Sequence, residues 1–121
     1  MPIQNVNSNN STITYICESI HIESLFLYKN DLSGVIPKTI GQMTNLEEID
    51  ISSNPIIGSV PSSIGTLTLL QRLHVGDMKL NGTIPSSIGH LKKLRNLVAD
   101  NNNLSGSIPA EIGELSDLSE F

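Results

Sequence analysis

The chain has 121 residues, enough for one domain. Apolar residues make up 38% of it and charged residues 16%, which excludes a disordered polyelectrolyte. The net charge of -5 argues against nucleic-acid binding through a basic surface, and an aromatic content of 3% requires an aliphatic core. No apolar run approaches the length of about 18 residues that a membrane-spanning helix needs, so none is predicted.

The N-terminal stretch carries few structural signals. Residues 1–7 have neither a basic start nor an apolar run, so they do not read as a secretory signal. Residues 4–14 are rich in Asn, Ser and Thr, and we expect them to form a poorly ordered lead-in. Cys17 is the only cysteine, which excludes an intrachain disulfide.

From residue 25 onward, one pattern recurs every 24 residues without insertion or deletion. An Ile-Pro or Val-Pro pair begins at positions 36, 60, 84 and 108, and an Ile-Gly pair begins at 40, 64, 88 and 112. Two other columns are apolar: Leu25, Ile49, Leu73, Leu97 and Phe121, and then Leu27, Ile51, Val75 and Ala99. So many aligned columns do not arise by chance, and they predict a one-dimensional stack of turns.

Each repeat is expected to contain a short strand, a tight bend and a helical return. Leu25 and Leu27 are two residues apart, which puts both side chains on one face of a strand. Stacked strands would then form a parallel sheet. Asn30, Asn54 and Asn102 follow the strands, where their amides can bond the backbone of their own turn and of the next.

The strand positions that flank the buried columns vary completely from turn to turn, as a binding surface allows. Phe26 and Tyr28 are predicted to be exposed there, either as interface anchors or as a cover for the N-terminal edge. Asp50, Arg72 and His74 lie on adjacent strands and form either a polar patch or an ordinary solvated face. The predicted partner-binding residues are Phe26, Tyr28, Glu48, Asp50, Arg72, His74, Asn96, Val98 and Asp100.

Catalysis and metal binding are the competing chemistries. Ser52 and His74, with Asp50 or Asp77, are the residue types of a nucleophilic triad. An open, shallow sheet, however, neither builds an oxyanion site nor excludes water. The three histidines fall in different repeat columns, so they do not converge on a metal. We therefore expect no enzymatic activity, no metal and no cofactor.

The segment Leu97–Gly113, LVADNNNLSGSIPAEIG, closely resembles the plant-specific leucine-rich repeat, LxLxxNxLSGxIPxxIGxL. The resemblance covers residues 20–121. It implies an α/β solenoid, a right-handed coil with a short parallel β-sheet on the concave face and 3₁₀ or short helical returns on the convex side. Residues 20–121 would form four 24-residue repeats plus a partial fifth, and residues 1–19 an N-terminal flank that resembles a truncated cap.

Similar arrays form the ectodomains of plant receptor-like kinases and receptor-like proteins, and the polygalacturonase-inhibitor proteins. The resemblance implies a non-catalytic module, extracellular or at the cell surface, that binds a protein or peptide on its concave face, with a possible co-receptor. Neither nucleic acid nor a membrane segment of this chain is expected. The alternatives are an enzyme inhibitor of the polygalacturonase-inhibitor type and a structural fragment without a partner of its own. Since four or five strands span about 20–24 Å and a stable interface needs ~800 Å² from each side, the isolated chain should bind weakly.

Some features depart from the family pattern. Met78 replaces a strand-following asparagine, so we expect a looser third turn. Cys17 lacks the partner usual in the family's cap, and Phe121 ends the chain within a strand, which indicates a fragment, a truncated product, or a short member with covered ends.

Glycosylation sequons, which weakly support secretion, begin at Asn9, Asn10, Asn81 and Asn103. The acidic C-terminal end is a solvated surface or a contact for a further repeat or a basic partner.

Overall fold

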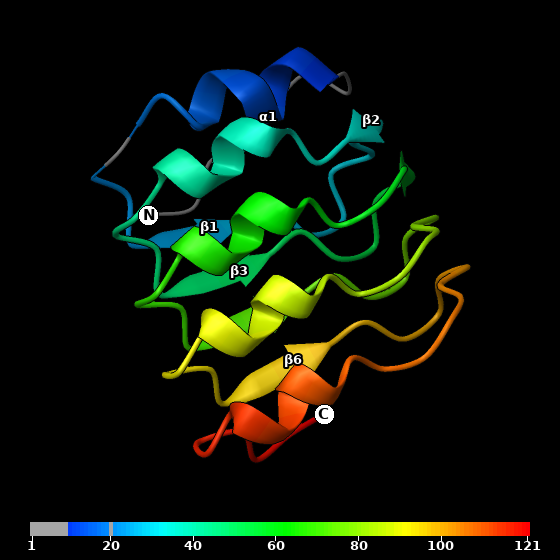
Figure 1. The fold of residues 1–121 in the computed structure, drawn as a ribbon. Coiled ribbons are helices and arrows are strands. Elements are labelled where there is room, and N and C mark those ends of the chain that lie inside the picture. Colours follow the sequence, from blue (N-terminus) through cyan, green and yellow to red (C-terminus); the bar gives the residue numbers. More distant parts are fainter. Residues whose placement is uncertain (1–9, 20) are drawn as a thin grey trace.

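The computed structural model describes residues 10–19 and 21–121. A short helix, α1 (Asn10–Ile16), is followed by four similar turns that stack in chain order (Figure 1). Each turn carries a three-residue strand on one side: β1 (Ser24–Phe26), β3 (Glu48–Asp50), β5 (Arg72–His74) and β6 (Asn96–Val98).

These strands form one parallel sheet in the order β1-β3-β5-β6, in the register that the 24-residue period predicts. A bridge from Asn96 to Glu120 begins a further pairing beyond β6. Because the register never slips, equivalent side chains of successive turns lie side by side on the same face. One such buried column consists of Leu25, Ile49, Leu73 and Leu97.

The predicted helical returns are 3₁₀ helices, stacked on the side of the coil opposite the strands (Figure 1). Each follows a proline whose φ lies between -63° and -73°, the value that the ring imposes at a helix start. Glycine within the helices lets neighbouring returns approach, since a Cβ at Gly65 would lie 2.7 Å from Ser87 Cβ. The four helices are η1 (Lys38–Gln42), η2 (Ser62–Thr66), η3 (Ser86–His90) and η4 (Ala110–Glu114).

A second parallel sheet, of two strands, is formed by the stretches of chain that connect a main-sheet strand to the 3₁₀ helix after it. The sequence pattern did not predict this sheet. It pairs β2 (Gly34–Val35) with β4 (Ile56–Ile57). Backbone bonds continue the ladder into the third turn, from Lys79 N–H to the Ile56 carbonyl at 2.9 Å and from Asn81 N–H to the Gly58 carbonyl at 2.8 Å. Backbone hydrogen bonds therefore join successive turns along this flank of the coil as well as in the main sheet.

Asn54 and Asn102 bond the backbone of their own turn, as predicted, but the second turn that each joins is the preceding one and not the next. Asn54 is 2% exposed, and its Nδ2 donates to the carbonyls of Leu27 at 2.9 Å and Ile51 at 2.8 Å. Its Oδ1 accepts from the N–H groups of Asn30 and Leu32 at 3.0 and 2.9 Å, so one side chain joins two turns. Asn102 joins the third and fourth turns in a similar way: its Nδ2 donates to the carbonyls of Val75 and Ala99, and its Oδ1 accepts from the N–H group of Leu80.

Met78 occupies the corresponding place in the third turn and is buried, with 6% of its surface exposed. Its thioether fills the space of the amide but has no N–H to donate and is a weak acceptor. The looser packing expected around it stays a prediction.

The N-terminal segment corrects one expectation. Residues 10–14, expected to be part of a poorly ordered lead-in, belong to α1, while residues 1–9 lie outside the described residues. Ile13 and Ile16 are three positions apart, so both face the coil, where they and Cys17 join the continuous hydrophobic core. The polar composition of this segment suggested disorder. Burial of two isoleucines on one face of the helix explains why it is ordered instead.

Burial changes the chemistry of Cys17. The thiol is 1% exposed, and burial raises its pKa above the ordinary value, against a smaller opposing effect of the Thr39 side chain. Since the thiolate is the reactive form, this cysteine is a packing residue at the N-terminal end of the coil.

The core is aliphatic, as the composition required. Its buried apolar side chains are Ile, Leu, Val, Met and Cys, contributed by α1, the strands and the returns. Within the described residues, no helix has the length and apolarity that crossing a membrane would require.

Candidate binding surface on the parallel sheet

The outward face of the main sheet gathers the residues that the sequence analysis selected. In each strand the central residue is buried and its two neighbours are at least partly exposed. The parallel register aligns these outward positions across the turns. One outward row is Phe26, Asp50, His74 and Val98, and the other is Ser24, Glu48, Arg72 and Asn96.

Tyr28 and Asp100 extend this face beyond the ends of the strands. Tyr28 lies two residues after β1 and is 52% exposed, as predicted. Phe26 is partly exposed, less than the exposed position that the pattern predicted for it. The aromatic end of the surface therefore offers one open ring and one half-buried ring.

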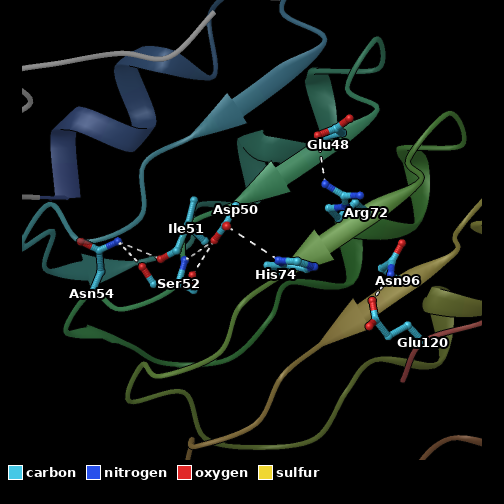
Figure 2. Close-up of polar contacts among 9 residues, drawn as sticks. All are labelled: Glu48, Asp50, Ile51, Ser52, Asn54, Arg72, His74, Asn96 and Glu120. Carbon is cyan, nitrogen blue, oxygen red and sulfur yellow. Dashed lines mark hydrogen bonds and ion pairs between the residues drawn. The ribbon is translucent and has the colours of Figure 1, made fainter.

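One cross-strand ion pair and one carboxylate–imidazole contact occupy the centre of the surface (Figure 2). Glu48 Oε2 lies 3.7 Å from an Arg72 guanidinium nitrogen, and Asp50 Oδ2 lies 3.7 Å from His74 Nδ1. The Arg72 pair is exposed, and such pairs contribute ~0–1 kcal/mol, so their main effect is to hold the side chains in place. That these residues form a polar patch for a ligand, and not an ordinary solvated face, stays a prediction.

The arrangement of Ser52, Asp50 and His74 is not that of a catalytic triad. The Ser52 hydroxyl donates to Asp50 Oδ1, and the same carboxylate lies beside His74 through its other oxygen. The carboxylate therefore stands between the hydroxyl and the imidazole, whereas a nucleophilic serine needs the imidazole as its direct base. Among the residues that the structure describes, no three His, Cys, Asp or Glu side chains are grouped to hold a metal ion.

At the fourth turn the sheet surface opens into a groove of about 630 Å³. His74, Val98 and Asp100 form its border with the sheet, and Leu104, Ile108 and Phe121 are among its apolar lining residues. Sequence reasoning missed the groove. Its lining includes Leu97, Ala99 and Leu104, which belong to inward columns that the 24-residue period already marks.

Solved structures with the same coil come from plant receptors. The ectodomain of the Arabidopsis receptor kinase HAESA, in complex with an extended IDA peptide hormone, is 36% identical with a TM-score of 0.89 over 99% of this chain and 20% of HAESA. The ectodomain of the Arabidopsis receptor kinase GASSHO1/SCHENGEN3, in complex with CASPARIAN STRIP INTEGRITY FACTOR 2, is 39% identical with a TM-score of 0.87 over 89% of this chain and 13% of the receptor. The Arabidopsis BIR2 ectodomain is 33% identical with a TM-score of 0.76, over 79% and 50% of the two chains.

These matches confirm the predicted leucine-rich-repeat solenoid and its resemblance to plant receptor ectodomains. A family model described as a leucine-rich repeat region matches residues 2–121, and the chain belongs to this family. No curated protein sequence matches the chain significantly. The chain spans about one fifth or less of HAESA and GASSHO1/SCHENGEN3 and half of BIR2.

Proposed function

We propose that this chain is a non-catalytic binding module that holds a peptide or protein ligand on the concave face of its sheet. The observation that carries the proposal is the contrast between a uniform buried column and varied outward rows held in one register. A rigid sheet fixes the outward side chains before a ligand arrives, which lowers the entropy cost of binding. The peptide complexes of HAESA and GASSHO1/SCHENGEN3 support the same conclusion by similarity.

The proposed contact residues are the nine selected from the sequence, and they differ in what they can offer. Tyr28 supplies an open aromatic ring at the N-terminal end. The Glu48–Arg72 ion pair and the Asp50–His74 contact between β3 and β5 present polar groups at the centre of the surface. Val98 and Asp100 supply apolar and acidic contacts beside the groove. The surface therefore favours a ligand that crosses several strands and changes in character along its length.

We also propose that the module acts outside the cell and that residues 1–19 form a flank to the repeats in residues 20–121. Asn81 and Asn103 begin sequons and are exposed on the coil, which is compatible with glycan attachment. The receptors with the same coil are ligand-binding ectodomains, which supports a role without catalysis and gives a co-receptor as a further partner class.

A binding experiment with single substitutions tests the proposal. Micromolar or weaker saturable binding is expected from one or more members of a pooled synthetic peptide library, because the strip is smaller than the ~800 Å² of a stable interface. Tyr28→Ala should weaken that binding about tenfold or more, as loss of an anchoring aromatic does. Lys93→Ala, an exposed position outside the sheet, serves as the matched control.

The two variants must differ for the proposal to stand. Equal loss of binding in Tyr28→Ala and Lys93→Ala would place the contact elsewhere. Nanomolar one-to-one binding by the isolated chain would contradict the argument from interface size.

A further inference from the structure

We propose that the flank of the coil carries a single N-linked glycan, attached to Asn81 and packed against Ile57. The flank is formed by β2, β4 and the equivalent stretches of the next two turns, which stack along one side of the coil (Figure 1). This inference rests on the proposed role outside the cell, because N-linked glycans are added to secreted chains. It adds to that role a modification site and a side of the coil that partners do not reach.

Two sequons lie side by side on this flank. They begin at Asn81 and Asn103 and end at the hydroxyl residues Thr83 and Ser105. The backbone N–H of Asn103 donates to the Leu80 carbonyl at 2.8 Å. In a parallel ladder an amide that donates to one residue lies opposite the residue after it, so Asn103 lies opposite Asn81. The next bond of the ladder places Ser105 opposite Thr83 in the same way.

The sequon side chains face solvent. Asn81 and Asn103 are exposed, as are the hydroxyl residues that end their sequons, whereas Leu80 is fully buried. Alternation along the ladder explains the contrast, because neighbouring side chains point to opposite faces. Asn81 is held through its backbone, whose N–H donates to the Gly58 carbonyl at 2.8 Å. Its side-chain amide therefore points away from the core from a fixed position.

Attachment uses the side-chain amide of Asn81 and an oligosaccharide carried on a lipid diphosphate. Nδ2 forms a bond to the anomeric carbon of the first N-acetylglucosamine. The bond from that carbon to the diphosphate breaks, the lipid diphosphate leaves, and Nδ2 loses one proton. Thr83 supplies the hydroxyl that the sequon requires.

An exposed apolar side chain lies next to Asn81 on the same face. The bond from Asn81 to the Gly58 carbonyl places Asn81 opposite Ser59, so Ile57 is its diagonal neighbour. Diagonal neighbours are about 7–8 Å apart, within reach of the first sugar of a glycan. Ile57 is 51% exposed, and Val35, which lies opposite it, is 38% exposed. The acetyl methyl group and the apolar ring face of the sugar can cover these side chains.

The register favours one glycan, and it favours Asn81. Neighbouring strands are about 4.8 Å apart, so first sugars on both Asn81 and Asn103 would compete for the same space. The diagonal neighbour of Asn103 is the exposed Lys79, which offers a charged group in place of an apolar one. A chain with both glycans would be strained where the third and fourth turns meet. The secreted chain should therefore carry one.

The first test measures occupancy in the full chain, secreted from eukaryotic cells behind an added signal sequence. Glycopeptide mass spectrometry reads each sequon separately from those at Asn9 and Asn10. We expect most molecules to carry a glycan at Asn81 and few at Asn103. Asn81→Gln should at least double the occupancy of Asn103. Ser105→Ala, which removes the Asn103 sequon, should leave the occupancy of Asn81 unchanged.

The second test measures the packing. An endoglycosidase trims the glycan to its first sugar, and the melting temperature is compared with that of Asn81→Gln. The trimmed chain should melt about 2 °C or more higher, because the first sugar covers Ile57. Ile57→Ser should remove most of this difference. Lys79→Ser, a matched change at an exposed position of the same face, should preserve it.

Three outcomes would overturn the inference: an unmodified Asn81, glycans on both asparagines of one molecule, or equal effects of Ile57→Ser and Lys79→Ser. The proposed function fails or stands separately. If Asn81 is unmodified while Tyr28→Ala abolishes peptide binding, the binding face stands and the glycan site does not. An occupied Asn81 on a chain that binds no peptide would show the reverse.

Discussion

Asn54 shows how much one side chain can hold together in this coil. Its amide serves three backbone carbonyls and two N–H groups on two turns. Asn54→Ala would leave several of these groups unpaired, at about 1–3 kcal/mol for each buried one, so we expect it to lower the free energy of unfolding by about 3–5 kcal/mol. Urea denaturation followed by circular dichroism measures the change.

The control for this prediction is Asn103→Ala. Asn103 is exposed, and its backbone N–H donates to the Leu80 carbonyl whatever its side chain is. Its replacement should alter the free energy of unfolding by less than about 0.5 kcal/mol. Equal losses in the two variants would show that the asparagine column does not stabilise the coil.

Met78 allows the converse experiment at a neighbouring position. In two turns a leucine backbone amide donates to the Oδ1 of a strand-following asparagine. Leu32 donates to Asn54 at 2.9 Å, and Leu80 donates to Asn102 at 3.0 Å. Met78→Asn would offer the same acceptor to the amide of Ile56, and we expect a gain of about 1 kcal/mol in the free energy of unfolding. Met78→Leu, which adds no acceptor, should give no gain, and an Asn variant less stable than the Leu variant would contradict the prediction.

At the scale of the element, the close stacking of the 3₁₀ helices depends on glycine. A Cβ at Gly65 would lie 2.7 Å from Ser87 Cβ and 2.8 Å from the Ser87 carbonyl oxygen, whereas one at Gly113 would have no atom within 4 Å. Gly65→Ala should therefore lower the free energy of unfolding by about 1–3 kcal/mol through overpacking. Gly113→Ala should be neutral or slightly stabilising, because alanine favours helical backbone.

The two glycine variants form a matched pair in equivalent helices, measured by the same urea titration. A large loss in both would mean that backbone conformation, not the spacing of the helices, requires glycine at this position. Neither glycine has a positive φ, which makes the spacing the expected cause.

At the scale of the whole molecule, we expect the isolated 121-residue chain to open first at the turn that contains β6. The amides of Val75 and Leu97 both donate at 2.8 Å, to the carbonyls of Val98 and Glu120, but Val75 lies one turn further inside. The α1 helix covers the opposite end of the coil, so fraying there is opposed (Figure 1). Because a solenoid is held by contacts between neighbouring turns, the Val75 amide should exchange with solvent at least about tenfold more slowly than that of Leu97.

Hydrogen exchange followed by NMR measures both rates in one sample. Equal protection of the two amides would show that the chain opens in a single cooperative step, and the picture of neighbour-by-neighbour stability would fail for this length of array.

The sequence identified the members of the candidate surface, but not how they interact. Alternation around Leu25 and its equivalents was sufficient to predict which strand residues face outward. The contact between Asp50 and His74 and the partial burial of Phe26 depend on side-chain directions across neighbouring strands. These directions are set by packing between turns, which a one-dimensional pattern does not contain.

By itself, the sequence determined the coil: its 24-residue period, the parallel strands, the buried columns and the asparagine bonds all follow from spacing, because identical turns stack in identical register. Tertiary structure decided the rest. Ile13 and Ile16 pack into the core of the coil, which explains why a polar-looking segment is helical there. The contact between Asp50 and His74 likewise joins two neighbouring turns, so it is a property of the assembled coil and of no single repeat.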